Sequence, residues 1–390
     1  MDPTQSVNHP FYSVKKVFAA ACCALAIFGV TMFALGALLP PLTKEIPEAV
    51  TLPPMLSIGI LIGTMLFGPV VDKWGYKWLL VASIVMTFTG LLGLMLLKEL
   101  NLLRVCIIFF GLGGGIINGE TSALVSDIYD DTKRGKMMSL FSTFYCIGAL
   151  LWTFVCSFID YMIPLTVVLV LIAVLALFCL CIKFPAAKPK ENVSFKKSVG
   201  LLKYPMLLLF SAVLFFQSGF EGISGNYTSS FLTNNGINQN IATFSLTMMT
   251  IGMFLGRWVL GGLMQKLKLI EIITGYLLLA LIGSGLMWIA PKGIILAYIS
   301  TTLIGFGAGA TFPVILTYLG GAFKQLSGTA FSIAMFIALC GNFLFNFTTG
   351  QTFKTGSHAF FPAYLVIAVA IMLILLPIAT RSAAKFKSKE

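Results

Sequence analysis

Two glutamates, Glu120 and Glu221, stand inside long apolar stretches of the sequence. At the centre of a membrane-spanning helix an acidic side chain costs roughly 2.5 to 3.5 kcal/mol, so it is a candidate for binding and releasing a cation. The alternative is a structural hydrogen bond to a neighbouring helix. We therefore treat both glutamates as candidate proton-coupling residues.

Polar side chains around Glu221 recur at helical spacing and share one helix face. Two further stretches carry similar sets of hydroxyl, amide and aromatic groups. A neutral polyhydroxylated ligand needs many such donors and acceptors together with an aromatic platform. The alternative is that these groups bond helices to one another. The candidate substrate-binding residues are Gln217, Glu221, Ser224, Thr228, Tyr145, Trp152, Asn342 and Asn346.

The composition indicates which elements position these residues. Of 390 residues, 58% are hydrophobic and 10% are charged, whereas soluble domains carry roughly 25% charged residues. The mean hydropathy is +0.96. Such a chain requires a lipid bilayer as its solvent, which excludes soluble enzymes, disordered chains and collagen-like fibres.

The chain contains twelve apolar stretches of the length that crosses a bilayer, about 20 residues. The first is too long for a signal peptide and lacks a small-residue cleavage site, so it is predicted to stay as a helix. The sequence thus predicts an all-α membrane protein with twelve transmembrane helices. The predicted spans are 17–40, 52–71, 78–97, 103–128, 137–158, 164–183, 205–231, 241–264, 270–290, 294–320, 328–350 and 359–380.

The basic residues are distributed unevenly between the two ends of these helices. Of 26 Lys and Arg residues, 20 fall on the side that also holds both termini, five fall on the other side, and Arg257 lies inside a helix. The excess predicts that the first side is cytoplasmic and that the membrane is the plasma or inner membrane. The net charge of +12 therefore reflects topology rather than nucleic-acid binding.

A duplication divides the chain. Residues 184–204 form a basic, Pro-containing linker between predicted halves at 1–183 and 205–390. Three glycines of the first half recur 193 residues later and a glycine cluster recurs 194 residues later, as parallel six-helix repeats would require. The matched pairs are Gly68 and Gly261, Gly135 and Gly328, Gly148 and Gly341, and the clusters starting at Gly111 and Gly305.

The side chains that serve most metal and catalytic sites are scarce or scattered. All eight cysteines lie in apolar runs without a CxxC pair, and the two histidines, His9 and His358, lie far apart in the sequence. Nucleophile-base pairs, HExxH and phosphate-binding loops are lacking. We expect no metal, no cofactor and no enzymatic activity.

The segment from Gly68 to Lys77, GPVVDKWGYK, resembles the G-x-x-x-D-[RK]-x-G-[RK]-[RK] loop of the major facilitator superfamily, with Tyr76 in place of one basic residue. The resemblance implies the fold of that superfamily, with a substrate site between two halves that rock against each other. The loop implies a gate at the cytoplasmic side, and for Arg257 we leave pairing at that gate or snorkelling open. The candidate gate residues are Gly68, Asp72, Lys73, Gly75, Lys77, Asp127, Arg134 and Arg257.

Further segments resemble the fucose-galactose-glucose:cation symporter family. The run GETSA at 119–123 resembles the family's E-T-A-A segment, whose glutamate is implicated in proton coupling, and Gly219-Phe220-Glu221 resembles its Y-V-G-x-E run. The first helix departs from some sugar symporters because residues 17–40 contain no acid. Glu120 and Glu221 then share the coupling, or Glu221 binds sugar hydroxyls while Glu120 alone takes the proton.

The resemblance implies a secondary active transporter that imports a hexose or deoxyhexose with a proton. Sodium remains an alternative coupling ion, and an exporter of drugs or small metabolites remains an alternative function with the same fold. We expect a monomer in the lipid bilayer, with a small-molecule substrate and no nucleic-acid partner. A receptor or a membrane-embedded enzyme is disfavoured, because no soluble domain or catalytic motif is found in the sequence.

Overall fold

The computed structural model describes residues 11–186, 200–264, 266–323 and 327–387, and side chains are described except at 72, 131–132, 327–328 and 385–387. His9 and most of the predicted linker lie outside these ranges. The described chain is helical. Its long helices are α1 (Val14–Glu45), α2 (Pro53–Leu96), α3 (Leu100–Ile128), α4 (Asp131–Phe158), α5 (Met162–Cys181), α7 (Pro205–Asn234), α8 (Gln239–Leu263), α9 (Leu269–Leu286), α10 (Ile294–Ala322), α11 (Ser327–Lys354) and α12 (Phe361–Lys387).

Short 3-10 helices, η1 (Pro47–Thr51), η2 (Ala290–Lys292) and η4 (His358–Phe360), lie in three of the connections. Helix α2 contains two of the predicted spans, because it is kinked at Gly75, where φ is 72° and ψ is 167°. A residue with a Cβ rarely adopts that conformation, which explains the glycine of the loop motif. With α2 divided there, the described chain has twelve helices long and apolar enough to cross a membrane. The twelve-helix prediction is confirmed.

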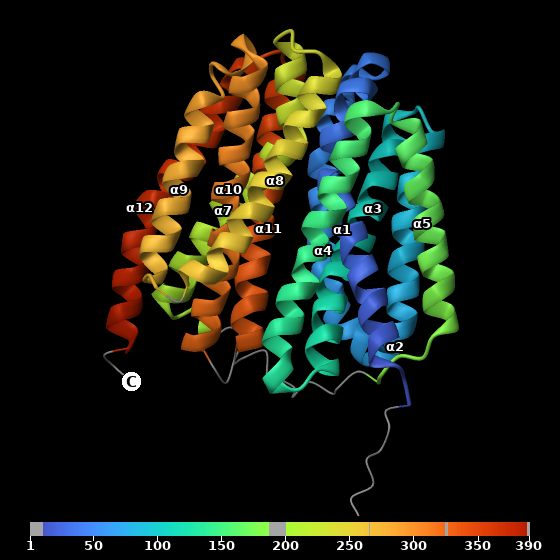
Figure 1. Cartoon of the computed structure of the whole chain (residues 1–390), viewed down its shortest axis with the longest axis vertical. Coiled ribbons are helices and arrows are strands. Elements are labelled where there is room, and N and C mark those ends of the chain that lie inside the picture. Colours follow the sequence, from blue (N-terminus) through green and yellow to red (C-terminus); the bar gives the residue numbers. More distant parts are fainter. Residues whose placement is uncertain (1–10, 187–199, 265, 324–326, 388–390) are drawn as a thin grey trace, which may run out of the picture.

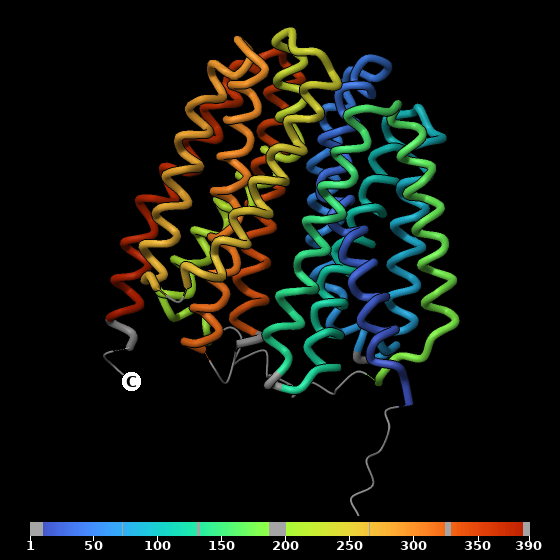
Figure 2. Tube along the Cα trace, in the orientation of Figure 1, coloured from blue at the N-terminus to red at the C-terminus, as the bar shows by residue number. Residues whose placement is uncertain are grey.

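The helices form two groups that lie side by side (Figure 1). The first group comprises α1 to α5 and the second α7 to α12, and the trace of each group is continuous in sequence (Figure 2). Helix α5 ends, α7 begins and α12 ends at the lower end of the view, where α1 also begins. We call this the linker end, and the opposite end, which holds η1 and η4, the far end.

Gly111 of α3 and its repeat Gly305 of α10 lie at equivalent helix contacts in the two halves. A Cβ on Gly111 of α3 would collide with the carbonyl oxygen of Leu56 in α2, and a Cβ on Gly305 of α10 would collide with that of Met249 in α8. Leu56 and Met249 are themselves 193 residues apart. Glycine lets helix backbones approach closely where side chains would separate them. Gly111 and Gly305 therefore allow equivalent helix pairs to pack closely in the two halves, whereas Gly68, Gly135 and Gly261 have open space beside them.

The outward faces of the bundle are apolar. On α5, Val167, Val170, Leu171 and Val174 are each more than half exposed. A soluble protein does not present such a continuous apolar surface, whereas a bilayer solvates it.

Candidate functional site

The two halves meet near the middle of their helices through a tyrosine and a glutamate. The Tyr145 hydroxyl on α4 donates to Glu221 Oε1 on α7 over 3.1 Å. Helix α4 is placed for this contact by its close packing on α1, since Cβ atoms at Gly29 or Gly148 would collide with the facing backbone of Tyr145 or Ala26. The sequence predicted both residues at the substrate site, and the structure brings them together.

Arg257 of α8 completes a group of charged and polar side chains at this contact. Its Nη1 lies 3.4 Å from the Cys146 Sγ, and its Cζ lies 5.1 Å from the centre of the Tyr145 ring. Its Nε is buried without a hydrogen-bond partner among the described residues, and its charge acts on Glu221. We call Tyr145, Cys146, Glu221 and Arg257 the central cluster.

Arg257 was expected to pair at the gate or to snorkel. In the structure it lies against Tyr145 and Cys146 of the other half instead. Cys146 was not predicted at the site, and a small residue in an apolar run gives no signal that could have identified it.

Other predicted residues on α4 and α7, the helices that carry Tyr145 and Glu221, retain unused hydrogen-bonding capacity. Trp152 is 3% exposed, and its indole Nε1 has no partner among the described residues; the same holds for Thr228 Oγ1 and Gln217 Oε1. Trp152 and Thr228 each follow a cluster residue by seven positions, so both lie about 10 Å farther along their helices. Gln217 Nε2 is already bonded to the Ala308 carbonyl. Buried groups left without partners are rare and mark places where a ligand or water binds.

Asn342 and Asn346 of α11, which the sequence indicated as candidate substrate-binding residues, bond helices to one another in the structure. Asn342 Nδ2 donates to the Ser218 carbonyl over 2.8 Å, and its Oδ1 accepts from Ser57 of α2 over 2.7 Å. Asn346 accepts from Asn226 of α7 and donates to Asn342. These amides thus bond α11 to α7 and to the other half. Ser224 donates to the Phe220 carbonyl of its own helix.

Glu120 lies apart from the central cluster. It is fully buried in α3, and neither carboxyl oxygen has a hydrogen-bond partner among the described residues. Its surroundings belong to its own half, namely the Leu80 backbone of α2 and Cys179 of α5. Glu120 and Glu221 therefore occupy separate environments.

The gate residues at the linker end make contacts within the first half. Asp127 Oδ2 accepts from the Tyr76 hydroxyl over 2.7 Å, Arg134 Nε donates to the Ser126 carbonyl over 3.0 Å, and Lys77 Nζ donates to the Leu180 carbonyl over 2.7 Å. Tyr76, the departure from the motif, is buried and contributes a hydroxyl in place of a cation. Lys73 is exposed, Gly68 has open space beside it, and the Asp72 side chain lies outside the described residues.

At the far end, polar contacts that the sequence did not suggest join the halves. Lys354 of α11 pairs with Glu48 of η1 over 3.0 Å, and Lys44 of α1 donates to Gln239 of α8 over 2.7 Å. Tyr227 of α7 also donates to the Val50 carbonyl over 3.1 Å. We call these three pairs the far-end seam. Loop residues at opposite ends of the sequence carry no pattern that predicts such pairs.

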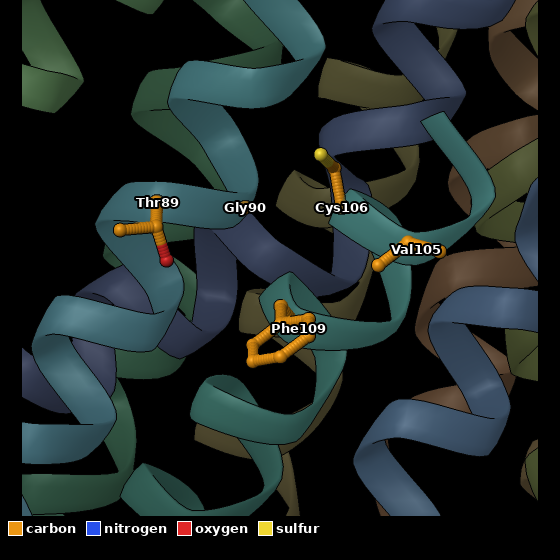
Figure 3. A pocket seen from close by; sticks show the side chains of 5 residues that line it. All are labelled: Thr89, Gly90, Val105, Cys106 and Phe109. Atoms are coloured by element: carbon orange, nitrogen blue, oxygen red, sulfur yellow. The ribbon is translucent and has the colours of Figure 1, made fainter. Parts of the chain in front are cut away.

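A hollow on the bundle surface offers no comparable chemistry. It measures about 240 Å³, lies between α2 and α3, and is lined by Thr89, Gly90, Val105, Cys106 and Phe109 (Figure 3). The Thr89 hydroxyl donates to the Met86 carbonyl of its own helix. The groups most suited to bind a polar ligand are thus those of the central cluster and its neighbours.

The sequence matches the Major Facilitator Superfamily over residues 17–346. The chain belongs to this superfamily. A comparison with curated proteins finds no match.

Solved structures with the same fold include several symporters. The D-xylose-proton symporter superposes with a TM-score of 0.77 at 15% identity, over 92% of this chain and 97% of that one. The nucleoside transporter NupG, solved as a mutant, gives 0.77 at 14% identity, over 94% and 99%. The fucose:proton symporter FucP of E. coli, also a mutant, gives 0.62 at 18% identity, over 93% and 98%. At these identities the similarity establishes the fold.

The family and these structures bear out the major facilitator fold predicted from the loop at Gly68 to Lys77. Together with the twelve long apolar helices, they make the chain an integral multi-pass membrane protein of a transporter superfamily.

Proposed function

We propose that this protein is a secondary active transporter that imports a hexose or deoxyhexose together with a proton, by alternating access. The superfamily supports transport. The neighbours that are proton symporters of the pentose xylose and the deoxyhexose fucose support a sugar as substrate and a proton as the coupling ion, and the second supports a deoxyhexose. The distribution of Lys and Arg supports cytoplasmic termini, and we further propose that the protein is a monomer in the inner membrane.

The observation that carries the coupling step is the burial of Glu120 without a hydrogen-bond partner. An ionised carboxylate in that setting lacks water, and the polar group beside it is the Leu80 backbone, so its charge costs several kcal/mol. Proton binding removes this cost. Neutral Glu120 permits the first half to close around it, and ionised Glu120 favours the state in which water reaches the carboxylate.

The substrate site that we propose is the central cluster with Trp152, Thr228 and Gln217. Their unused polar atoms suit sugar hydroxyls, and the Trp152 indole can serve as an aromatic platform. Glu221 accepts hydrogen bonds from the substrate in addition to the one from Tyr145. Because Tyr145 and Glu221 belong to different halves, a ligand bound between them contacts both.

The far-end seam closes one side of this site, so we assign the structure to a state that opens toward the cytoplasm. In the opposite state the seam separates. The linker-end residues of the gate, Asp72, Lys73, Lys77 and Arg134, then come within reach of the second half.

Uptake into proteoliposomes tests the proposal. The panel contains labelled hexoses, deoxyhexoses and, because NupG shares the fold, nucleosides, each with an inward proton gradient, an inward sodium gradient or neither. Accumulation of a hexose or deoxyhexose that requires the proton gradient is the expected result. Absence of sugar flux, or uptake driven only by sodium, would contradict the proposal, and efflux of unrelated compounds would favour an exporter.

A further inference from the structure

The two charged side chains of the central cluster, Glu221 and Arg257, belong to the same half of the protein. Glu221 lies on α7 and Arg257 on α8, and both helices belong to the second half. Tyr145 and Cys146 lie on α4 of the first half. When the halves rock apart, Tyr145 and Cys146 leave, whereas Arg257 keeps its place relative to Glu221.

The titratable and charged groups that face Glu221 are few. From α4 these are Tyr145 and, through Arg257, Cys146; from α8 there is Arg257 itself. The described parts of α1, α10, α11 and α12 that pack on α7 add no charged side chain that acts on Glu221. Arg257 is thus the cation that compensates a carboxylate at this position, and Glu120 has no such neighbour on its own contacts.

Compensation of this kind determines which form of a buried acid is stable. A carboxylate near a guanidinium and a hydroxyl donor keeps its charge, whereas one without either takes up a proton. Glu221 and Arg257 are each half-buried, and removal of the Arg257 charge leaves the Glu221 carboxylate with the Tyr145 hydroxyl, at a cost that a proton can relieve.

We propose that Arg257 is a positioning residue that keeps Glu221 ionised in both states of the cycle, so that one proton, carried by Glu120, accompanies each substrate. This inference rests on the proposed function for its transport consequence, but the protonation state of Glu221 can be measured without transport. The Tyr145 hydroxyl supports the carboxylate only while the halves are together at the cluster.

Infrared spectroscopy of the full-length protein in lipid at pH 7 tests the inference directly, since a protonated carboxyl group absorbs separately from a carboxylate. In a Glu120→Gln background we expect no signal from a protonated carboxyl. Adding Arg257→Gln should produce one such signal, and adding Glu221→Gln to that protein should remove it. Arg257→Lys, which keeps the charge, and Tyr145→Phe, which keeps Arg257, are the matched controls and should leave the signal absent.

A protonated carboxyl in the Glu120→Gln protein that disappears with Glu221→Gln would overturn the inference, as would an Arg257→Gln variant with no new signal. Arg257→Met provides a second neutral variant if Arg257→Gln does not fold. The thermal unfolding temperature of each variant shows that its spectrum belongs to folded protein.

The transport readout is the number of protons per substrate, obtained from the membrane potential at which flux reverses. We expect one proton per substrate for the parent and for Arg257→Lys, because Glu120 alone binds and releases a proton in each cycle. A ratio of two in the parent would overturn the inference. If the parent transports no sugar, the proposed function is wrong. The infrared result then tests the role of Arg257 by itself.

Discussion

Glu120 and Glu221 have the same side chain and both lie within long apolar helices, but the structure gives them opposite surroundings. Glu120 is enclosed by its own half and has no hydrogen-bond partner among the described residues. Glu221 faces the other half and accepts from the Tyr145 hydroxyl, and Arg257 lies over the ring of the same tyrosine. Burial alone therefore does not assign a role to an acid in a membrane protein. The partners of the carboxyl group decide whether it releases its charge or keeps it.

The largest effect is expected for Glu120→Gln, which fixes the neutral form. Gradient-driven accumulation should vanish while exchange of labelled for unlabelled substrate persists, because the halves can still rock without a proton. Uptake should also lose its dependence on pH, whereas in the parent uptake falls as the outside pH rises and fewer protons bind. Measurement of accumulation and exchange in the same proteoliposomes checks this. Gradient-driven accumulation by the variant would contradict the role of Glu120 as the proton carrier.

Tyr145→Phe tests whether the hydrogen bond to Glu221 serves substrate binding rather than proton coupling. The change removes one hydrogen bond to a charged group, worth about 1.5 to 3 kcal/mol, so the substrate should bind roughly tenfold or more weakly. Coupling to the proton should remain. Equilibrium binding and the accumulation ratio measure the two effects, and Phe28→Leu on the same ring contact is the control for packing. Loss of coupling with intact binding would contradict the assignment.

Asn342→Ala distinguishes helix bonding from substrate binding. It removes the hydrogen bonds to Ser57 and Ser218 and leaves buried groups unpaired, which should lower the stability by about 1 to 3 kcal/mol per group. Thermal unfolding should therefore shift, while substrate affinity in the folded fraction stays within a few-fold of the parent. A large loss of affinity without a loss of stability would place Asn342 at the substrate instead.

Glu48→Gln should have the smallest effect. The pair with Lys354 is partly exposed, at 43% and 51% of the two side chains, and pairs of this kind contribute about 0.2 to 1 kcal/mol. The balance between the two states should shift toward opening at the far end by less than about fivefold, because 1.4 kcal/mol corresponds to tenfold. The exchange rate at low and high salt measures this, and the difference should disappear at high salt.

The sequence predicted the fold from its apolar lengths. Its twelve spans agree with the helices within several residues; the stretch 205–231, for example, corresponds to Pro205–Asn234. The kink at Gly75 falls between the predicted spans 52–71 and 78–97. Helix length and glycine placement are local properties, so they can be predicted without knowledge of the packing.

The site was predicted only in part. Tyr145, Glu221 and the unpaired groups of Trp152 and Thr228 were identified from helical spacing, but their contacts depend on how the halves dock. The docking brings Arg257 to Tyr145, and it gives Asn342 a structural bond to Ser57. Such contacts between distant parts of the sequence leave no periodic signal, so a sequence without an alignment cannot reveal them.

Proton movement driven by the substrate tests most directly whether Glu120, and not Glu221, carries the coupling proton. Substrate is added outside lightly buffered proteoliposomes that hold no gradient, and the outside pH is followed together with labelled substrate uptake. We expect the outside to become alkaline with the parent and with Glu221→Gln at saturating substrate. With Glu120→Gln the outside pH should stay constant while the substrate still enters. Alkalinisation with Glu120→Gln, or its loss only with Glu221→Gln, would contradict the assignment of the coupling proton to Glu120.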